Sequence, residues 1–169
     1  MDAHADFDEF VAARWVRLYR LAYLLTADEA AAEDLLRTAM EKAFARWPRV
    51  MQAASPEAYV RRLMVDAVVP DRRRPARRRE WLRAVLPDHP MPPEDDHVVD
   101  RTLLWPLVCA LPEGQRAVVV LRFHEGLSDR EAAEVLGCAV ATVTSQTDDA
   151  MRALLRGLAA AQAREVAQG

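Results

Sequence analysis

Apolar residues recur every three or four positions over three stretches in the first half of the chain, which is the spacing of amphipathic helices. The first stretch spans 7–25. The second spans 32–47, and Pro48 is expected to end it because proline lacks a backbone amide. The third begins with Ser55 as N-cap and Pro56 as first helical residue. The side chains expected to face the core are Phe7, Phe10, Val11, Trp15, Leu18, Leu21, Ala22, Leu25, Ala32, Leu35, Leu36, Ala39, Met40, Ala43, Phe44, Trp47, Tyr59, Val60, Leu63, Met64 and Ala67.

Capping and breaking residues mark further helix boundaries. The segments 26–29 (Thr-Ala-Asp-Glu) and 128–131 (Ser-Asp-Arg-Glu) fit the capping box, in which the hydroxyl accepts a first-turn amide and the glutamate reaches back. Pro70 is expected to stop or kink the third helix. Another helix is predicted over 111–123, and Gly126 after it suits the positive φ of a C-cap.

The segment after Gly126 has the spacing of a helix-turn-helix. Counting Asp129 as the first position, Ala133 is fifth, Gly137 ninth, Val140 twelfth and Val143 fifteenth. The small Ala suits a close contact between two helices and Gly suits the left-handed turn, while both valines are expected to anchor the second helix on the first. Such a unit either docks on DNA, with its second helix in the major groove, or serves as a packing module.

The second helix of this unit, 141–156, is polar but carries no net positive charge. Arg152 and Arg156 are balanced by Asp148 and Asp149, whose carboxylates would meet the DNA backbone unfavourably. Hydroxyl and amide groups along the helix are suited to hydrogen bonds with bases or phosphates. They belong to Thr142, Thr144, Ser145, Gln146 and Thr147.

The composition is that of a foldable helical protein. Of 169 residues, 51% are apolar and 29% charged, the net charge is −3, and there are five glycines, so an all-α fold is expected. No apolar run approaches the ~18 residues that span a bilayer and no secretory signal is visible, so we expect a cytoplasmic protein without membrane contact. Cys109 and Cys138 are expected to be buried, reduced thiols. No familiar catalytic motif is present, and neither a metal nor a cofactor is expected.

Charge is strongly partitioned along the chain. Residues 59–86 hold nine basic and three acidic side chains. Such a segment is either a solvated charged stretch or an electrostatic footprint for phosphate, and the density of its arginines favours nucleic acid. Residues 87–100 contain four prolines and five acids, which is typical of a linker. We therefore predict two small helical domains, 5–86 and 101–165, joined by this acidic, proline-rich linker. The densest basic cluster consists of Arg72, Arg73, Arg74, Arg77, Arg78 and Arg79.

Together these features resemble the extracytoplasmic-function (ECF) sigma factors of bacterial RNA polymerase, and within them the actinobacterial SigE-like group. The resemblance covers roughly 7–158. The stretches that carry it most specifically are 32–36 (AEDLL), 44–47 (FARW), 56–63 (PEAYVRRL), 111–116 (LPEGQR) and 127–137 (LSDREAAEVLG).

The resemblance implies a factor without chemistry of its own that binds core RNA polymerase and promoter DNA. Its second helix would grip the β′ clamp helices, and the β flap is a further contact. The segment from Tyr59 to the arginine cluster would meet the minus-ten element, the linker would follow the RNA path, and 128–152 would bind the minus-thirty-five element. The implied polymerase-binding residues are Glu33, Asp34, Leu35, Arg37, Glu41 and Phe44. The implied DNA-binding residues are Arg61, Arg62, Arg72, Arg73, Arg74, Arg77, Arg78, Arg79, Ser128, Thr142, Thr144, Ser145, Gln146 and Arg152.

The chain departs from the family pattern at DNA-facing positions. Thr144, Gln146 and Asp149 stand where the family usually carries Lys or Arg, so positive charge is lost there. The end of the third helix has Asp66, Pro70 and Asp71 where Asn and an aromatic are usual, and Arg37 stands where Gln is common.

Three functions remain open from the sequence. The first is an initiation factor that directs polymerase to promoters. The second is a degenerate sigma homologue acting as an interaction protein with weak or no DNA binding. The third is a helical enzyme, which the lack of converging catalytic residues disfavours. In either of the first two, an anti-sigma partner covering Leu35 and Phe44 is also conceivable.

Overall fold

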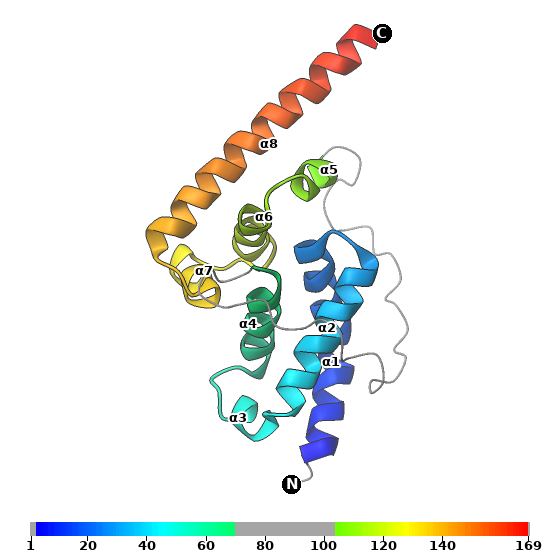
Figure 1. Cartoon of the computed structure of the whole chain (residues 1–169), viewed down its shortest axis with the longest axis vertical. Helices are drawn as coiled ribbons and strands as arrows, with labels where there is room; N and C mark the ends of the chain where they lie inside the picture. The colour runs from blue at the N-terminus through cyan, green and yellow to red at the C-terminus, as the bar shows by residue number, and fades with distance from the viewer. Residues whose placement is uncertain (1–2, 70–103, 169) are drawn as a thin grey trace. The chain divides into compact units, whose positions relative to one another are not determined.

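The computed structural model describes residues 3–69 and 104–168, and every element in these ranges is a helix (Figure 1). The all-α prediction is therefore confirmed. The chain divides into two compact units, Met1–Pro92 and Pro93–Gly169. The segment 87–100 and the domain limits predicted beside it lie outside the described residues.

The first unit is built from α1 (Ala3–Thr26), α2 (Glu29–Phe44), α3 (Trp47–Met51) and α4 (Pro56–Val68). In Figure 1, α1 and α2 run side by side in opposite directions, and α2 also packs against α4. The apolar stripes of these helices form one core. Its most completely buried large side chains are Leu18, Leu21, Leu25, Leu36, Met40, Val50, Val60, Met64 and Val65.

An aromatic cluster joins α1 to α2 and α3. The ring centroid of Phe7 lies 4.9 Å from that of Phe44 and 5.1 Å from that of Trp47. Phe10 also contacts Trp47, with centroids 5.2 Å apart. Phe7 and Trp47 are buried as predicted, but Phe44 is 39% exposed because α2 ends there. Phe44 therefore lies at the edge of the core, where a partner can reach it.

The capping box predicted with Thr26 at its head is wrong. Asp28 is the N-cap of α2, and its Oδ1 accepts the Ala31 amide at 2.8 Å. The Thr26 hydroxyl lies 2.9 Å from the Ala22 carbonyl, inside the last turn of α1. Ala27 makes the turn with φ of 59°, a left-handed conformation that costs a non-glycine residue about 1 kcal/mol.

Pro48 begins a helix rather than ending one, which corrects a second prediction. α2 ends at Phe44, and Pro48 lies in the first turn of α3, where a missing amide leaves no hydrogen bond unmade. Ser55 and Pro56 open α4 as predicted, and the Ala58 amide donates to Ser55 Oγ at 3.2 Å.

The C-terminal end of α4 shows the influence of the following proline. The helix ends at Val68, and Val69 is extended (φ −92°, ψ 101°), the conformation that a residue before proline prefers. The buried face also differs from the predicted one, since Val65 is buried and Ala67 is exposed. Pro70 itself lies outside the described residues.

The second unit contains α5 (Leu104–Cys109), α6 (Glu113–Val119), the π-helical segment η1 (Val120–His124), α7 (Asp129–Leu136) and α8 (Val140–Gln168). The long helix α8 packs against α5, α6 and α7 (Figure 1). The sequence pattern did not predict α5, because six residues are too few to show a helical period.

The helix predicted over 111–123 ends in a π turn. The Glu125 amide donates to the Val120 carbonyl, five residues earlier, at 3.0 Å. Gly126 follows with φ of 69°, so the positive φ predicted there is confirmed.

Two close contacts hold α5 in the second unit. A Cβ placed on Gly157 of α8 would lie 2.5 Å from Leu107 Cδ2, so only glycine fits without moving α5 or the Leu107 side chain. Arg116 of α6 is buried and donates to the Cys109 carbonyl at 2.8 Å.

Both cysteines are free, but the prediction that they are buried needs correction. Cys109 and Cys138 are half-buried, although burial is still enough to raise the pKa of each thiol. Within 3–69 and 104–168, no helix combines the length and the apolar character needed to cross a bilayer.

Candidate nucleic-acid interface

The predicted helix-turn-helix forms in the second unit. α7 ends at Leu136, Gly137 adopts φ of 65°, and α8 begins at Val140. Ala133 and Val143 are both buried, Val143 with 0% exposure, and α7 packs against α8 as predicted. Val140, the first residue of α8, is 46% exposed, so its predicted anchoring role needs correction.

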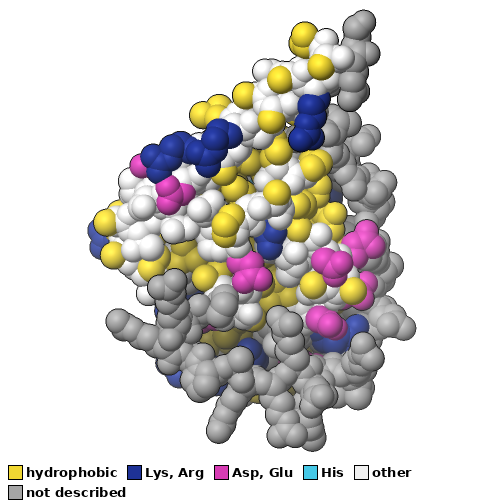
Figure 2. All heavy atoms as spheres, turned by 45° about the horizontal axis from the view of Figure 1, so that its top comes forward, with side chains coloured by type: hydrophobic (Ala, Val, Ile, Leu, Met, Phe, Trp, Pro, Cys, Tyr) yellow, Lys and Arg dark blue, Asp and Glu magenta, His cyan; other side chains and the backbone are white. Residues whose placement is uncertain are grey.

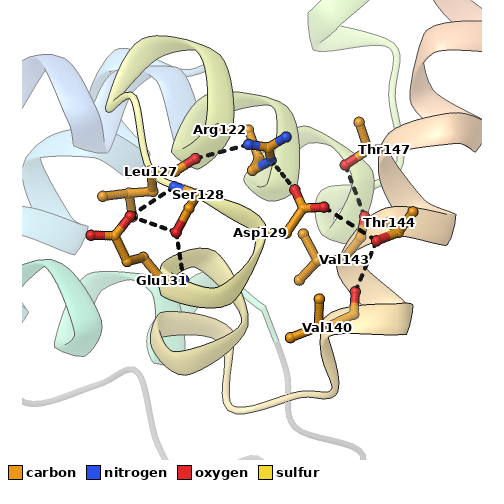
Figure 3. Close-up of polar contacts among 9 residues, drawn as sticks. All are labelled: Arg122, Leu127, Ser128, Asp129, Glu131, Val140, Val143, Thr144 and Thr147. Atoms are coloured by element: carbon orange, nitrogen blue, oxygen red, sulfur yellow. Dashed lines mark hydrogen bonds and ion pairs between the residues drawn. The ribbon is translucent and has the colours of Figure 1, made fainter.

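The predicted capping box at Ser128 is confirmed. Ser128 Oγ accepts the Glu131 amide at 3.2 Å and donates to Glu131 Oε2 at 2.7 Å, and the Ser128 amide donates to the same oxygen at 2.8 Å (Figure 3). The hydroxyl and then the amide of Ser128 hold the pKa of the Glu131 carboxyl below its usual value. The hydroxyl that was expected to contact DNA therefore already fixes the start of α7.

A polar network ties α7 and η1 to the second turn of α8. The Asp129 carboxylate forms an ion pair with Arg122 and its Oδ2 lies 3.3 Å from Thr144 Oγ1 (Figure 3). Arg122 Nη1 also donates to the Leu127 carbonyl at 3.0 Å. The contacting atoms of the ion pair, Arg122 Nε and Asp129 Oδ1, are shielded from solvent. The network fixes the start of α7 relative to the second turn of α8.

The hydroxyl and amide side chains of α8 divide between solvent and the protein. Thr142, Thr144 and Ser145 are exposed. Gln146 is half-buried, and its Oε1 would lie 3.7 Å from a Cβ placed on Gly114, so it faces α6. The Thr147 hydroxyl donates to the Val143 carbonyl at 2.8 Å. The exposed subset is therefore the one available to bases.

Charges on α8 are mixed, as the sequence predicts. Asp148 is exposed, and Asp149 forms an ion pair with Arg152 three residues later. Arg156 is exposed one turn beyond. Figure 2 shows basic and acidic side chains close together on the ridge of the molecule that α8 forms. The helix therefore presents no continuous basic surface to a phosphate backbone.

In the first unit, the Arg61 side chain is largely buried and does not extend into solvent. Its side chain is 11% exposed, and its guanidinium lies 3.7 Å from Glu57, which also pairs with Arg14 at 3.0 Å and Arg17 at 3.1 Å. The structure therefore argues against a direct DNA contact by Arg61, because its guanidinium lies beside Glu57, the carboxylate that joins α4 to α1 through Arg14 and Arg17. Arg62, the next residue, is exposed. The six arginines from Arg72 to Arg79 lie outside the described residues.

The polymerase-binding residues predicted on α2 lie at different depths. Glu33 and Asp34 are exposed, whereas Arg37 and Glu41 are half-buried. Burial raises the pKa of the Glu41 carboxyl, and the Arg37 charge opposes that shift. The candidate surface on α2 therefore consists of these four residues and the exposed edge of Phe44.

Leu35 must be removed from that surface. Its side chain is 7% exposed and belongs to the core of the first unit. The helical period of α2 puts it on the same stripe as Leu36 and Ala39, which are also buried.

The network at Asp129 is the part of the site that sequence reasoning missed. From the sequence, Asp129 was expected only to be the first position of the helix-turn-helix, and no role was predicted for Arg122. Fifteen residues separate Asp129 from Thr144, so no local spacing rule connects them. Among the described residues, no group of His, Cys, Asp or Glu side chains is arranged to hold a metal ion.

Comparison with known proteins agrees with this geometry. The family model for sigma-70, region 4 matches residues 102–154, which include the helix-turn-helix. The RNA polymerase sigma-E factor of Streptomyces coelicolor is 34% identical over 164 residues, covering 92% of this chain and 87% of the relative. The ECF RNA polymerase sigma factor SigL of Mycobacterium tuberculosis is 30% identical over 154 residues, covering 89% and 85%.

A solved structure shares the fold. It is the sigma factor RpoE of Bartonella quintana, crystallised in complex with the anti-sigma factor NepR, with a TM-score of 0.63 and 19% identity over 90% of this chain and 96% of that one. On the extent of the identity to its curated relatives, the chain belongs to the ECF family of RNA polymerase sigma factors.

Proposed function

We propose that this protein is a transcription initiation factor that binds core RNA polymerase and directs it to promoters. The observation that carries the proposal is the intact helix-turn-helix in a chain of this family. Its cap, left-handed glycine and buried valine are all in place, and α8 begins with exposed hydrogen-bonding side chains. The protein itself carries out no reaction, since polymerase makes the phosphodiester bonds, and it works in the cytoplasm.

In this role the start of α8 enters the major groove of the minus-thirty-five element. The N-terminal residues of a recognition helix are the ones that contact base edges. In α8 the exposed hydrogen-bonding residues at this end are Thr142, Thr144 and Ser145. Arg152 and Arg156 lie about two and three turns after Ser145 and face phosphate. The minus-ten element is met by Arg62 and the arginines from Arg72 to Arg79.

Polymerase binding is assigned to α2. Glu33 and Asp34 offer exposed carboxylates, and Phe44 offers an exposed aromatic edge at the end of the same helix. Arg37 and Glu41 lie between them at half depth. This mixture of rim charges around a partly buried aromatic is typical of protein–protein contacts. The β′ clamp helices are the expected partner of this surface, and the β flap contacts the second unit.

Run-off transcription with purified core polymerase and a pool of genomic promoters tests the proposal. The wild-type chain should bind polymerase and give transcripts from defined start sites. Asp34→Arg should weaken polymerase binding, whereas Thr142→Ala with Ser145→Ala should spare it and lower transcription by ~10-fold or more, the loss of about two hydrogen bonds. Gln162→Ala, an exposed change near the far end of α8, is the matched control. Absence of polymerase binding by the wild-type chain would refute the assignment.

The mixed charge of α8 favours a second candidate, a sigma homologue that binds polymerase or a regulator but reads DNA weakly. Asp148 is exposed and Asp149 pairs with Arg152, so both lower the pull of this helix on phosphate. Thr144→Lys, Gln146→Arg and Asp149→Arg together should restore promoter binding if lost charge is the cause. Unchanged binding would exclude lost charge as the cause.

An anti-sigma regulator is a further proposed partner. Phe44 is the exposed aromatic that such a partner would cover, and Leu35 is too deeply buried to take part. A pull-down from native cells tests this: recovery of polymerase without any small regulator would count against it, and Phe44→Ala should lower recovery of a regulator if one is present.

A further inference from the structure

The Thr144 hydroxyl is held by two groups that only accept hydrogen bonds. Its Oγ1 lies 3.3 Å from Asp129 Oδ2 and 3.2 Å from the Val140 carbonyl oxygen (Figure 3). A threonine hydroxyl has one hydrogen and two lone pairs. Because neither neighbour has a hydrogen to give, the Thr144 hydrogen points to one of these two, and each lies on the protein side of the hydroxyl.

Asp129 does not swing away from this position, because its other oxygen is occupied. Oδ1 forms an ion pair with Arg122, and the contacting atoms are shielded from solvent. Arg122 is in turn fixed by its hydrogen bond to the Leu127 carbonyl at 3.0 Å. The acceptor that faces Thr144 thus belongs to the first residue of α7 and is held there by Arg122.

The side of Thr144 that faces solvent therefore offers lone pairs and no hydrogen. In the major groove, adenine N6 and cytosine N4 present amino hydrogens, whereas guanine O6 and thymine O4 present acceptors. We propose that Thr144 selects an amino-bearing base, adenine or cytosine, over guanine or thymine on the DNA strand that it contacts. This inference rests on the proposed function, because it requires α8 to lie in the major groove.

A promoter series with every single-base change in the minus-thirty-five element tests the proposal, using polymerase loaded with the full chain. One position should prefer adenine or cytosine by about fivefold, the worth of one neutral hydrogen bond. Thr144→Val keeps the side-chain shape and should remove that preference, while Thr144→Ser should keep it. Replacing the preferred base by an analogue without its amino group should weaken wild-type binding about fivefold and leave the Thr144→Val complex unchanged.

The Asp129→Asn variant tests whether Asp129 orients the Thr144 hydroxyl or only stabilises the second unit. The amide oxygen would accept from Arg122, so the amide nitrogen would face Thr144 and donate to its oxygen. That bond uses the lone pair that faces residue 129 and leaves the hydroxyl hydrogen on the Val140 carbonyl, so an outward lone pair remains. The amino-base preference at that position should therefore persist at about fivefold while polymerase binding is unchanged. An equal loss of affinity for all four bases would give Asp129 a structural role only and overturn this part of the inference.

The outcomes distinguish failure of the base selection by Thr144 from failure of the proposed function as an initiation factor. If the loaded polymerase binds promoters but Thr144→Val changes the preference at no position, or removes a preference for guanine or thymine, the role of Thr144 is refuted and the proposed function stands. If the wild-type chain gives no promoter-specific binding at all, both are refuted.

Discussion

Replacing Ser128 with Ala removes the N-cap hydroxyl of α7 and so tests how strongly this cap stabilises α7, the helix that packs against α8. Two hydrogen bonds are lost, the one that Oγ accepts from the Glu131 amide at 3.2 Å and the one that it donates to Glu131 Oε2 at 2.7 Å. The bond from the Ser128 amide to Oε2, at 2.8 Å, can remain. Because all these groups are exposed, we expect the middle of the range measured for lost caps, about 1 kcal/mol. That corresponds to about a fivefold increase in the opening of α7.

The same change should alter the dependence of stability on pH. The folded-state pKa of Glu131 lies below the ordinary value of a glutamate, first because of the Ser128 hydroxyl and then because of the Ser128 amide. A lowered pKa means that the ionised carboxylate stabilises the fold above pH 4.5 and that this contribution is lost as the pH falls through the folded-state value. Ser128→Ala should reduce the stability that is lost at acid pH, and Glu131→Gln should abolish that loss.

Hydrogen exchange followed by mass spectrometry on the full chain measures the effect locally. Peptides from 128–137 report on α7, and peptides from α1 serve as an internal control because they belong to the other compact unit. Ser128→Gly is the matched variant, since glycine at an N-cap costs only a few tenths of a kcal/mol, about 0.3. Exchange in Ser128→Ala equal to that of the wild type at neutral pH would refute the capping argument. If this variant loses as much stability at acid pH as the wild type does, the assignment of that loss to Glu131 is refuted.

Further predictions concern packing, the backbone and charge. Val143→Ala should lower the stability of the second unit by about 2 kcal/mol, because two buried methyl groups are lost and a cavity is left behind. Val140→Ala, at an exposed position, should change the stability by less than about 0.5 kcal/mol. Equal urea midpoints for the two variants would contradict the argument from burial. Ala27→Gly should raise the urea midpoint of the first unit by relieving a φ of 59°, for a net gain of about 0.5 kcal/mol after the extra chain entropy of glycine. Glu57→Gln should cost that unit about 1–2 kcal/mol, because three arginines lose their shared carboxylate, and added salt should narrow the difference; a salt-independent loss would point to packing instead.

The features that the sequence predicted correctly are those with local signals. The capping box at Ser128 depends on residues three apart, and Gly137 and Gly126 are needed for positive φ whatever surrounds them. The all-α fold and the buried stripes of α1 and α2 follow from a helical period that extends over several turns.

The features that it missed depend on how segments meet. Thr26 and Asp28 are both good N-caps, and only the tight turn through Ala27 selects Asp28. Glu57 lies four residues before Arg61 on the same helix, but the two arginines of α1 that share its carboxylate become visible only when α4 packs against α1. The exposure of Val140 likewise depends on where α8 starts relative to α7.

The π turn at Val120–His124 gives the second unit a length constraint. It holds one residue more than an α-helical turn would, and each residue of an α-helix advances the chain by about 100°. A relative one residue shorter here would form a regular helix and carry a different side chain toward Asp129. A single-residue gap in an alignment at this turn would thus signal loss of the Arg122 support and, with it, a different base preference at the position that Thr144 contacts. Within the family, promoter choice would then change through deletion of one codon outside the recognition helix.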